Sequence, residues 1–174
     1  FERGYKAVFI AAGAQKVRKL GIPGEDGEGV LDCLEFLKQV SLGVFKGLGK
    51  KVVVVGGGNV AMDTARTAAR FSQTAGYDVG YENTEMDSAR MAIRLGAQEV
   101  HVVCLESKEE MPAHEHEVDG AEEEGVILHP SKGPKGILLE NNRVVGLKTI
   151  DVKSVFDSNG RFNPTFIEGS ESTI

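Results

Sequence analysis

The hydrophobic pattern of the chain centres on four consecutive valines at positions 52–55, which are followed directly by three glycines at 56–58. A continuous run of β-branched residues is typical of a parallel strand buried on both faces. The glycines end that run abruptly, and residues 60–70 then form an alanine-rich segment with the composition of a helix. This stretch therefore predicts a buried strand, a tight turn and a helix in succession.

Shorter apolar runs predict further elements on either side of this unit. Helices are expected over residues 31–40, where apolar residues recur at every third position, and over 113–124, where Pro112 would open the first turn. Buried strands are expected over residues 5–14, 99–105 and 126–129. The glycine-rich residues 21–29 are typical of a loop or an interdomain linker.

The C-terminal region has a different pattern, in which turn residues separate short β-prone runs. Asn141-Asn142 separates residues 137–139 from 144–155, and Asn159-Gly160 separates the latter run from 162–167. Such dipeptides between strands favour hairpin turns. The predicted fold is therefore α/β: a Rossmann-like parallel sheet with helices on both faces, followed by a C-terminal antiparallel β-meander.

A short internal duplication interrupts the region after the first helix of the parallel unit. Residues 62–68 recur as 86–92 at an offset of 24, with five of seven residues identical. We therefore expect an inserted helical segment at about residues 71–90. One recurrence is too little for a repeat architecture. Two interpretations remain: a lengthened crossover, or an added binding or oligomerisation surface.

Charge and composition narrow the class of partner. The 174 residues carry a formal net charge of −6 with a pI of about 5.3, which argues against nucleic-acid and anionic-membrane surfaces. No apolar run is long enough to span a membrane. Cys33 and Cys104 have neither metal-site nor disulfide-framework spacing, which favours a cytoplasmic protein. The chain begins at Phe1 without a signal-peptide pattern, so we expect a piece of a longer protein.

Gly56, Gly58 and Ala61 match the spacing G-x-G-x-x-A of dinucleotide-binding turns. The first glycine permits a tight turn, the second lets the backbone approach a pyrophosphate, and the small third residue lets the helix pack on its strand. Asp63 and Arg66, three apart on this helix, are expected to form an ordinary ion pair. A purely structural turn is the alternative to a nucleotide site. The predicted cofactor-binding loop comprises Gly56, Gly57, Gly58, Asn59, Val60 and Ala61.

Candidates for catalysis or metal binding are weaker. His114 and His116 alternate with glutamates, but residues two apart on a helix do not face each other, so no metal site is predicted. His101 and His129 belong to predicted strands and are interpreted as packing or surface residues. No nucleophile–base pair is found, and no catalytic side chain is assigned.

Five motifs carry a family resemblance: residues 11–14, 22–25, 56–66, 109–114 and 123–126. With these motifs in this order, the chain resembles the small (β) subunit of bacterial glutamate synthase and its relatives over nearly its whole length. Those proteins are flavoproteins of the pyridine nucleotide-disulphide oxidoreductase class. The run Glu-Glu-Met-Pro-Ala-His at 109–114 is the most specific motif, because no general nucleotide-binding rule produces it.

The resemblance implies an FAD domain into which an NAD(P)H domain is inserted, often with iron–sulfur clusters elsewhere in the parent protein. Residues 1–48 would be a flank from the FAD domain with a linker and a helix, and 49–174 would be the NAD(P)H-binding domain. Gly13 would lie in a strand returning from the FAD domain and contact cofactor, and Asn59 would add a hydrogen bond to the phosphates or the adjoining ribose. The implied partners are the missing FAD domain of the same chain and another redox subunit.

The choice between NADH and NADPH depends on the end of the second parallel strand. An acidic residue is usual about 20 positions after the glycines; Glu106 lies 48 positions after Gly58, or 24 once the duplication is discounted. The resemblance places two arginines here in members that use NADPH. A carboxylate accepts a hydrogen bond from a ribose 2′-OH and repels a 2′-phosphate, so NADH is favoured over NADPH. Lys108, two residues further on, is the counter-argument.

Three functions fit these observations. The first is the NAD(P)H-binding domain of an FAD-dependent oxidoreductase, which needs no catalytic side chain of its own and would be inactive as a fragment. The second is a non-catalytic nucleotide-binding or sensing module. The third, an S-adenosylmethionine-dependent methyltransferase, would favour an acid where Val55 stands. We expect the first.

Overall fold

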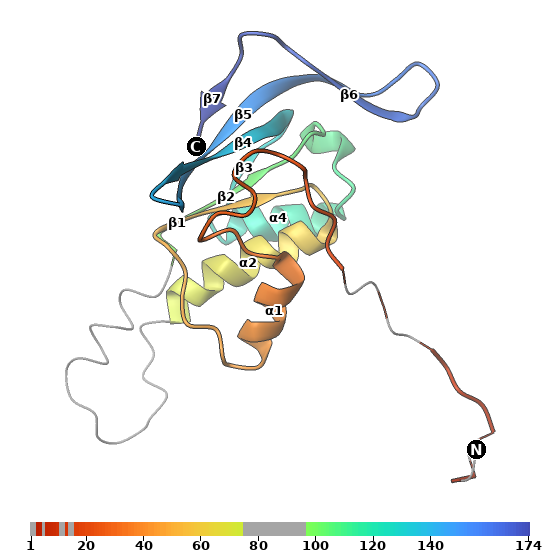
Figure 1. Ribbon diagram of the computed structural model, residues 1–174. Coiled ribbons are helices and arrows are strands. Elements are labelled where there is room, and N and C mark those ends of the chain that lie inside the picture. The colour runs from red at the N-terminus through yellow and green to blue at the C-terminus, as the bar shows by residue number, and fades with distance from the viewer. Residues whose placement is uncertain (1–2, 5, 11–12, 14–15, 75–96) are drawn as a thin grey trace.

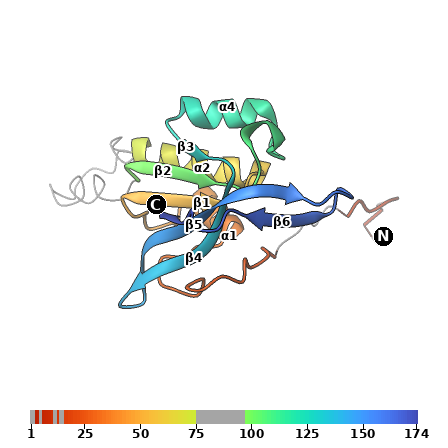
Figure 2. The ribbon, with the colours of Figure 1, turned by 90° about the horizontal axis from the view of Figure 1, so that it is seen from above.

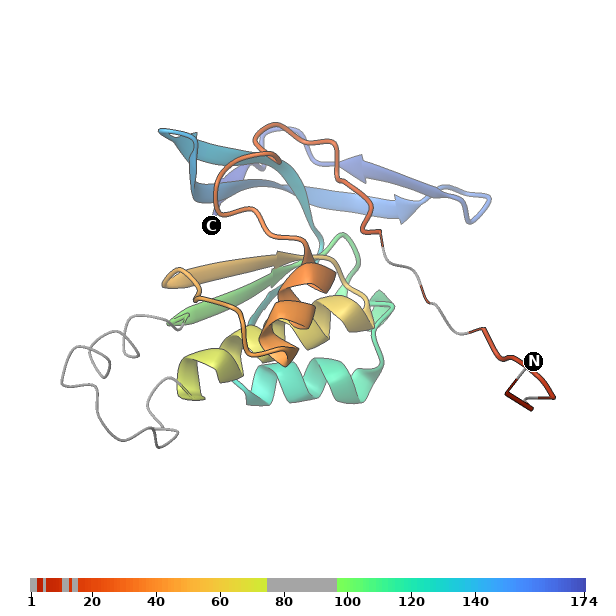
Figure 3. The ribbon, with the colours of Figure 1, turned by 60° about the horizontal axis from the view of Figure 1, so that its bottom comes forward.

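The computed structural model describes residues 3–4, 6–10, 13, 16–74 and 97–174, and its elements form three layers (Figure 1, Figure 3). A layer of helices, a three-stranded parallel sheet and a four-stranded antiparallel sheet are stacked in that order. The N-terminal arm extends away from these layers (Figure 1). The mixed α/β fold predicted from the sequence is confirmed.

The parallel sheet has the order β1-β2-β3, with β1 at Lys51–Val55, β2 at Glu99–Val103 and β3 at Ile127–His129. In its register Val53 pairs with His101, and His101 pairs with Ile127 on the other side. Because all three strands are parallel, their carboxyl ends meet at one edge of the sheet, where parallel α/β sheets bind their ligands.

The three described α-helices lie on one face of this sheet, whereas helices on both faces were expected. They are α1 (Cys33–Ser41), α2 (Asn59–Thr74) and α4 (Glu115–Glu123); the view from above shows α4 beside α2 and β3 (Figure 2). The physical reason is the strand order. Two right-handed crossovers that advance in the same direction across a sheet place their helices on the same face.

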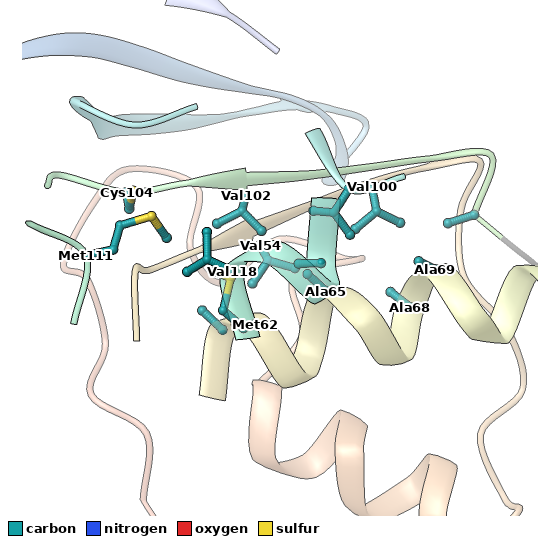
Figure 4. Packing of buried hydrophobic residues seen from close by; sticks show 14 of the residues in the cluster. Val54, Met62, Ala65, Ala68, Ala69, Val100, Val102, Cys104, Met111 and Val118 are labelled. Carbon is teal, nitrogen blue, oxygen red and sulfur yellow. The ribbon is translucent and has the colours of Figure 1, made fainter. Parts of the chain in front are cut away.

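A close-packed hydrophobic core joins α2 to the parallel sheet (Figure 4). The side chains of Val54, Val100 and Val102 extend from the sheet toward α2, where Met62 is fully buried. Small alanines on the same face of α2 allow the helix to approach the strands closely. The fully or nearly buried ones are Ala65, Ala68 and Ala69.

The antiparallel sheet consists of β4 (Lys132–Glu140), β5 (Arg143–Phe156), β6 (Phe162–Phe166) and the short β7 (Ser172–Thr173). Glu140 pairs with Arg143, so the turn between β4 and β5 contains only Asn141 and Asn142. Their φ angles of 49° and 66° are those of a type I′ hairpin turn. The antiparallel meander predicted from the sequence is confirmed.

The antiparallel sheet covers the face of the parallel sheet that the helices leave free. Along β2, Val102 belongs to the core on the helix side, and the next residue, Val103, points to the opposite face yet is fully buried. Backbone hydrogen bonds join the two sheets where β4 begins, since the Lys132 N–H donates to the Cys104 carbonyl at 2.9 Å. The second layer therefore replaces the second set of helices that the sequence analysis expected.

Three local predictions need correction. A strand was expected over residues 5–14, but the described residues of this range form none, because no described segment pairs with them. Phe9 is accordingly 91% exposed. The helix expected from Pro112 begins only at Glu115, after the short 3₁₀ helix η1 (Lys108–Glu110). α2 continues to Thr74 instead of ending at residue 70. The rest of the inserted segment predicted at about 71–90, and the recurring residues 86–92, lie outside the described residues.

The glycine-rich stretch 21–29, expected as a loop or an interdomain linker, packs against the β4–β5 hairpin through residues 23–28. The Glu28 N–H donates to the Asn142 carbonyl at 2.8 Å, and the Val144 N–H donates back to the Glu28 carbonyl at 3.0 Å. A Cβ on Gly24 would lie 2.4 Å from the Ile137 carbonyl oxygen, so only glycine fits there. α1 follows this segment and buries Phe36 in the same core as α2. The predicted boundary near residue 48 stays a prediction.

Candidate functional site

The three glycines at 56–58, here called the glycine loop, connect β1 to α2 at the carboxyl edge of the parallel sheet. Gly56 has a φ of 135°, which side chains rarely allow. Its N–H donates to the Val103 carbonyl at 2.8 Å, which extends the pairing of β1 with β2 by one residue. A Cβ on Gly56 would lie 3.5 Å from the Cβ of Ala61, so α2 starts close against the turn.

The other two glycines differ in their surroundings. Gly57 is buried, and a Cβ there would lie 2.9 Å from Oε2 of Glu106 and 3.1 Å from Cβ of Cys104. A Cβ on Gly58 would meet none of the described residues within 4 Å, its two chain neighbours aside. The glycine loop therefore has a filled side at Gly57 and an open side at Gly58, and the open side is the one from which a ligand can approach the backbone.

The start of α2 adds hydrogen-bond donors to the open side. The first helical bonds are donated by Ala61 and Met62, both to the Gly58 carbonyl, at 2.9 and 3.2 Å. The N–H groups before them belong to the first turn, which a helix leaves without internal acceptors. Asn59 and Val60, the first residues of α2, are exposed. Free N–H groups at the positive end of a helix form an anion-binding site.

The segment 111–114 lies against the filled side of the glycine loop. The Ala113 N–H donates to the Gly57 carbonyl at 3.0 Å, and the His114 N–H donates to Oδ1 of Asn59 at 2.9 Å. The segment is thus held by the glycine loop instead of forming the first turn of α4. This contact was not predicted from the sequence, although the unusual Glu-Glu-Met-Pro-Ala-His motif covers the same residues.

Glu106 follows β2 and reaches back toward the glycine loop. Its backbone carbonyl accepts a hydrogen bond from the Ser131 N–H at 2.8 Å, which fixes the turn that carries it. Its carboxylate lies beside Gly57, as the 2.9 Å approach to a Cβ there shows. Cys104 lies next to both residues, and burial raises the pKa of its thiol to about 11, so the thiol stays protonated and acts as a small core group.

Lys108 points toward α4. Its Nζ lies 2.7 Å from Oε2 of Glu122, and this hydrogen bond is the main reason that the pKa of Lys108 is raised. The ammonium group already has an acidic partner. Asp119 and Glu109 add further negative charge around it. The structure therefore groups Glu106 with the glycine loop and pairs Lys108 with the neighbouring helix.

Two further expectations concern Gly13 and Arg66. Gly13 is exposed, with a φ of 66°, and belongs to the N-terminal arm, which extends away from the layers that carry the glycine loop (Figure 1). Arg66 binds Glu117 on α4 and, at 3.0 Å, Glu124, which directly follows that helix. These contacts correct the expected pair with Asp63. Gly120 makes room for the guanidinium, since a Cβ there would lie 3.1 Å from Cζ of Arg66.

Within the described ranges, no three His, Cys, Asp or Glu side chains are grouped as metal ligands would be. The same residues include no helix with the length and apolar character needed to cross a bilayer.

Curated relatives match almost the entire chain. It is 37% identical to the NADP(+)-dependent formate dehydrogenase subunit beta of Moorella thermoacetica over 98% of this chain and 21% of that protein. It is 32% identical to the glutamate synthase (NADPH) small chain of Azospirillum brasilense over 99% of this chain and 33% of that protein. The chain thus spans about a fifth to a third of the length of these relatives.

A solved structure and a family sequence model agree with this likeness. The structure of Mycobacterium tuberculosis FprA in complex with NADPH matches 94% of this chain and 46% of its own chain, with a TM-score of 0.69 at 19% identity, which shows a shared fold. The family sequence model described as pyridine nucleotide-disulphide oxidoreductase matches residues 1–162. The chain belongs to the pyridine nucleotide-disulphide oxidoreductase family.

Proposed function

We propose that this chain is the NAD(P)H-binding domain of an FAD-dependent oxidoreductase that resembles the glutamate synthase small subunit. The observation that carries the proposal is the open side of the glycine loop. Apart from its two chain neighbours, no residue that the structure describes comes within 4 Å of a Cβ position at Gly58, and the first N–H groups of α2 follow it directly. A diphosphate fits such a place because the backbone can approach it closely and the helix terminus favours negative charge.

The described side chains suit a binding role more than a chemical one. When bound, the nicotinamide and flavin cofactors would carry out the hydride transfer between them. The chain would supply position and electrostatics through the glycine loop, α2 and the turn after β2. The absence of an assigned nucleophile or base is compatible with that division of labour.

We further propose a preference for NADH over NADPH, which rests on Glu106 and Lys108. The Glu106 carboxylate lies beside the glycine loop, where it can accept hydrogen bonds from ribose hydroxyls and would repel a 2′-phosphate. Lys108 is the nearest cation in sequence, and its ion pair with Glu122 weakens it as a phosphate ligand. The curated relatives named above are described as NADP- or NADPH-dependent, so this preference would distinguish the present chain from them.

The remaining parts of the proposal concern the whole protein. We infer that an FAD domain lies elsewhere in the same protein, with residues 1–48 as its flank, and that another redox subunit or iron–sulfur clusters accept or supply electrons. The short match to the relatives supports this, since each relative has room for further domains. A cytoplasmic location is proposed from the free cysteines Cys33 and Cys104.

The test uses the protein in its natural full length with its flavin bound. Adding NADH should bleach the flavin absorbance, and kcat/KM should be higher for NADH than for NADPH. Binding of NADH without flavin reduction would favour the alternative of a sensing module, and binding of S-adenosylmethionine in its place would favour a methyltransferase. A clear preference for NADPH would overturn the proposed role of Glu106.

A paired substitution sharpens the test of cofactor choice. Glu106→Arg should lower the ratio of kcat/KM for NADH to that for NADPH at least about tenfold, equivalent to 1.4 kcal/mol, since a guanidinium attracts the 2′-phosphate. Glu106→Gln serves as the control, because it removes the charge and keeps the shape. It should shift the ratio in the same direction by a smaller factor.

A further inference from the structure

The hydrogen bonds between segment 111–114 and the glycine loop fix the directions of two polar groups. In a planar trans peptide, the carbonyl and the following N–H point in opposite directions. The Ala113 N–H holds the Gly57 carbonyl toward segment 111–114 at 3.0 Å. The Gly58 N–H, which belongs to the same peptide unit, therefore points away from that segment and donates to no partner among the described residues.

The second bond acts on the Asn59 side chain. A primary amide has an accepting end and a donating end, and the His114 N–H holds the accepting end, Oδ1, at 2.9 Å. The donating end, Nδ2, is thereby turned away from His114. Asn59 is exposed, so this NH₂ group is available to a ligand. Without the His114 N–H, nothing in this contact would choose between the two orientations of the amide.

We propose that segment 111–114 is a positioning element for the nucleotide site, in which the His114 N–H orients the Asn59 amide and the Ala113 N–H orients the Gly57–Gly58 peptide. Both contacts turn donors toward the side where a diphosphate would bind. This inference rests on the proposed nucleotide site and adds what keeps its donors aligned. It also gives a physical role to the Met-Pro-Ala-His part of the motif, which no general nucleotide-binding rule explains.

Proline substitution at residue 114 tests the orienting bond. His114 has φ −64° and ψ 140°, and this φ is the one that proline adopts, so the substitution removes the N–H without changing the backbone angle of residue 114 itself. In the full-length protein, His114→Pro should raise the KM for NADH about tenfold, as expected for one charge-assisted hydrogen bond, and leave kcat within about twofold. The inhibition constant of adenosine, a competitor without phosphates, should not change.

Two further variants isolate the effect of the His114 N–H donor. His114→Ala also lacks the imidazole but retains the N–H, so the difference between the two variants at this position reports the donor. Glu115→Pro places a proline at the first position of α4, which favours it, and requires an extended residue before it, which His114 already is. This control should keep the wild-type KM. Thermal unfolding of each variant checks that the fold is retained.

A double-mutant cycle links the effect to Asn59. Asn59→Ala should raise the KM for NADH by itself, and His114→Pro should then add less than about twofold in that background, because the amide it orients is gone. The positioning role is wrong if His114→Pro and His114→Ala have equal KM values for NADH. It is also wrong if His114→Pro weakens the binding of adenosine as much as the binding of NADH. If the wild-type protein binds NADH no better than adenosine, the nucleotide site itself is wrong.

Discussion

Glu106 and Gly57 lie in contact across the carboxyl edge of the parallel sheet, with Oε2 of Glu106 2.9 Å from the place that a Cβ on Gly57 would take. Gly57→Ala should therefore displace the carboxylate and crowd Cys104 behind it. We expect the free energy of unfolding to fall by about 1–3 kcal/mol, as in other overpacked sites. Urea unfolding and the KM for NADH, which should rise severalfold, measure the two effects.

Gly58→Ala is the matched comparison, because a Cβ at Gly58 would contact no described residue beyond its chain neighbours and the φ of Gly58 is not positive. Its free energy of unfolding should stay equal to that of the wild type or rise by about 0.4–1 kcal/mol, since alanine restricts the unfolded chain. Nucleotide binding should weaken because the methyl group stands on the open side of the loop. Equal destabilisation by both alanines would contradict the described difference between the two glycines.

Arg66 links α2 to α4 through Glu117 and Glu124, with all three side chains less than a quarter exposed. Burial acts to raise the pKa of Glu124, but hydrogen bonds from Arg70 and Arg66 outweigh it and leave this pKa lowered. Arg66→Met should lower the free energy of unfolding by about 1–3 kcal/mol, because two partly buried carboxylates lose a partner.

The same ion-pair cluster predicts a pH dependence with a definite sign. A carboxyl group whose pKa is lower in the folded state contributes stability above its unfolded pKa, near 4.5, and loses it as the pH falls. Urea unfolding between pH 6 and pH 3 should show a shallower decline for Arg66→Met than for the wild type. Parallel curves would mean that Arg66 does not set the ionisation of Glu124.

His129 predicts a second pH effect, nearer neutrality. Its Nε2 lies 2.9 Å from Nδ1 of His101, and burial, His101 and Lys132 together lower the pKa of His129 from 6.5. A histidine that stays neutral in the folded state contributes stability above pH 6.5 and loses it as the pH falls through the folded pKa. His129→Gln should therefore show less loss of stability between pH 7.5 and pH 5.5 than the wild type. If the difference in free energy of unfolding between His129→Gln and the wild type stays constant across that range, the lowered pKa of His129 does not contribute to the pH dependence of stability.

The β4–β5 turn predicts a local stability effect. Asn141 and Asn142 both have positive φ, with Asn142 at 66°. Asn142→Gly should leave the free energy of unfolding unchanged or raise it by about 0.5–1 kcal/mol. Asn142→Val should lower it by about 1–2 kcal/mol, because a β-branched residue disfavours this conformation. Thermal unfolding of the two variants provides the measurement.

Local sequence signals account for the elements that were predicted correctly. Four valines followed by glycines specify a buried strand and a tight turn within one short stretch, and Asn141-Asn142 specifies a two-residue hairpin for the same kind of reason. Each depends on backbone conformations and side-chain shapes of neighbouring residues. The length of α2 and the start of α4 were predicted less well. At Ala113 and His114 the N–H groups find acceptors on the glycine loop before a helix can use that segment.

The sequence by itself determined that a glycine turn joins a buried strand to a helix and that an antiparallel meander follows, because these features depend on residues close together in the chain. Tertiary structure alone decided that Glu106 occupies the space beside Gly57 while the space beside Gly58 stays open. It also decided that Arg66 pairs with glutamates on and next to α4, and that an antiparallel sheet covers the second face of the parallel sheet. The first two relationships join residues about 50 positions apart, and the third brings Lys132 to Cys104, which lies 28 positions earlier in the chain. They follow from how the layers stack, and no local pattern encodes that stacking.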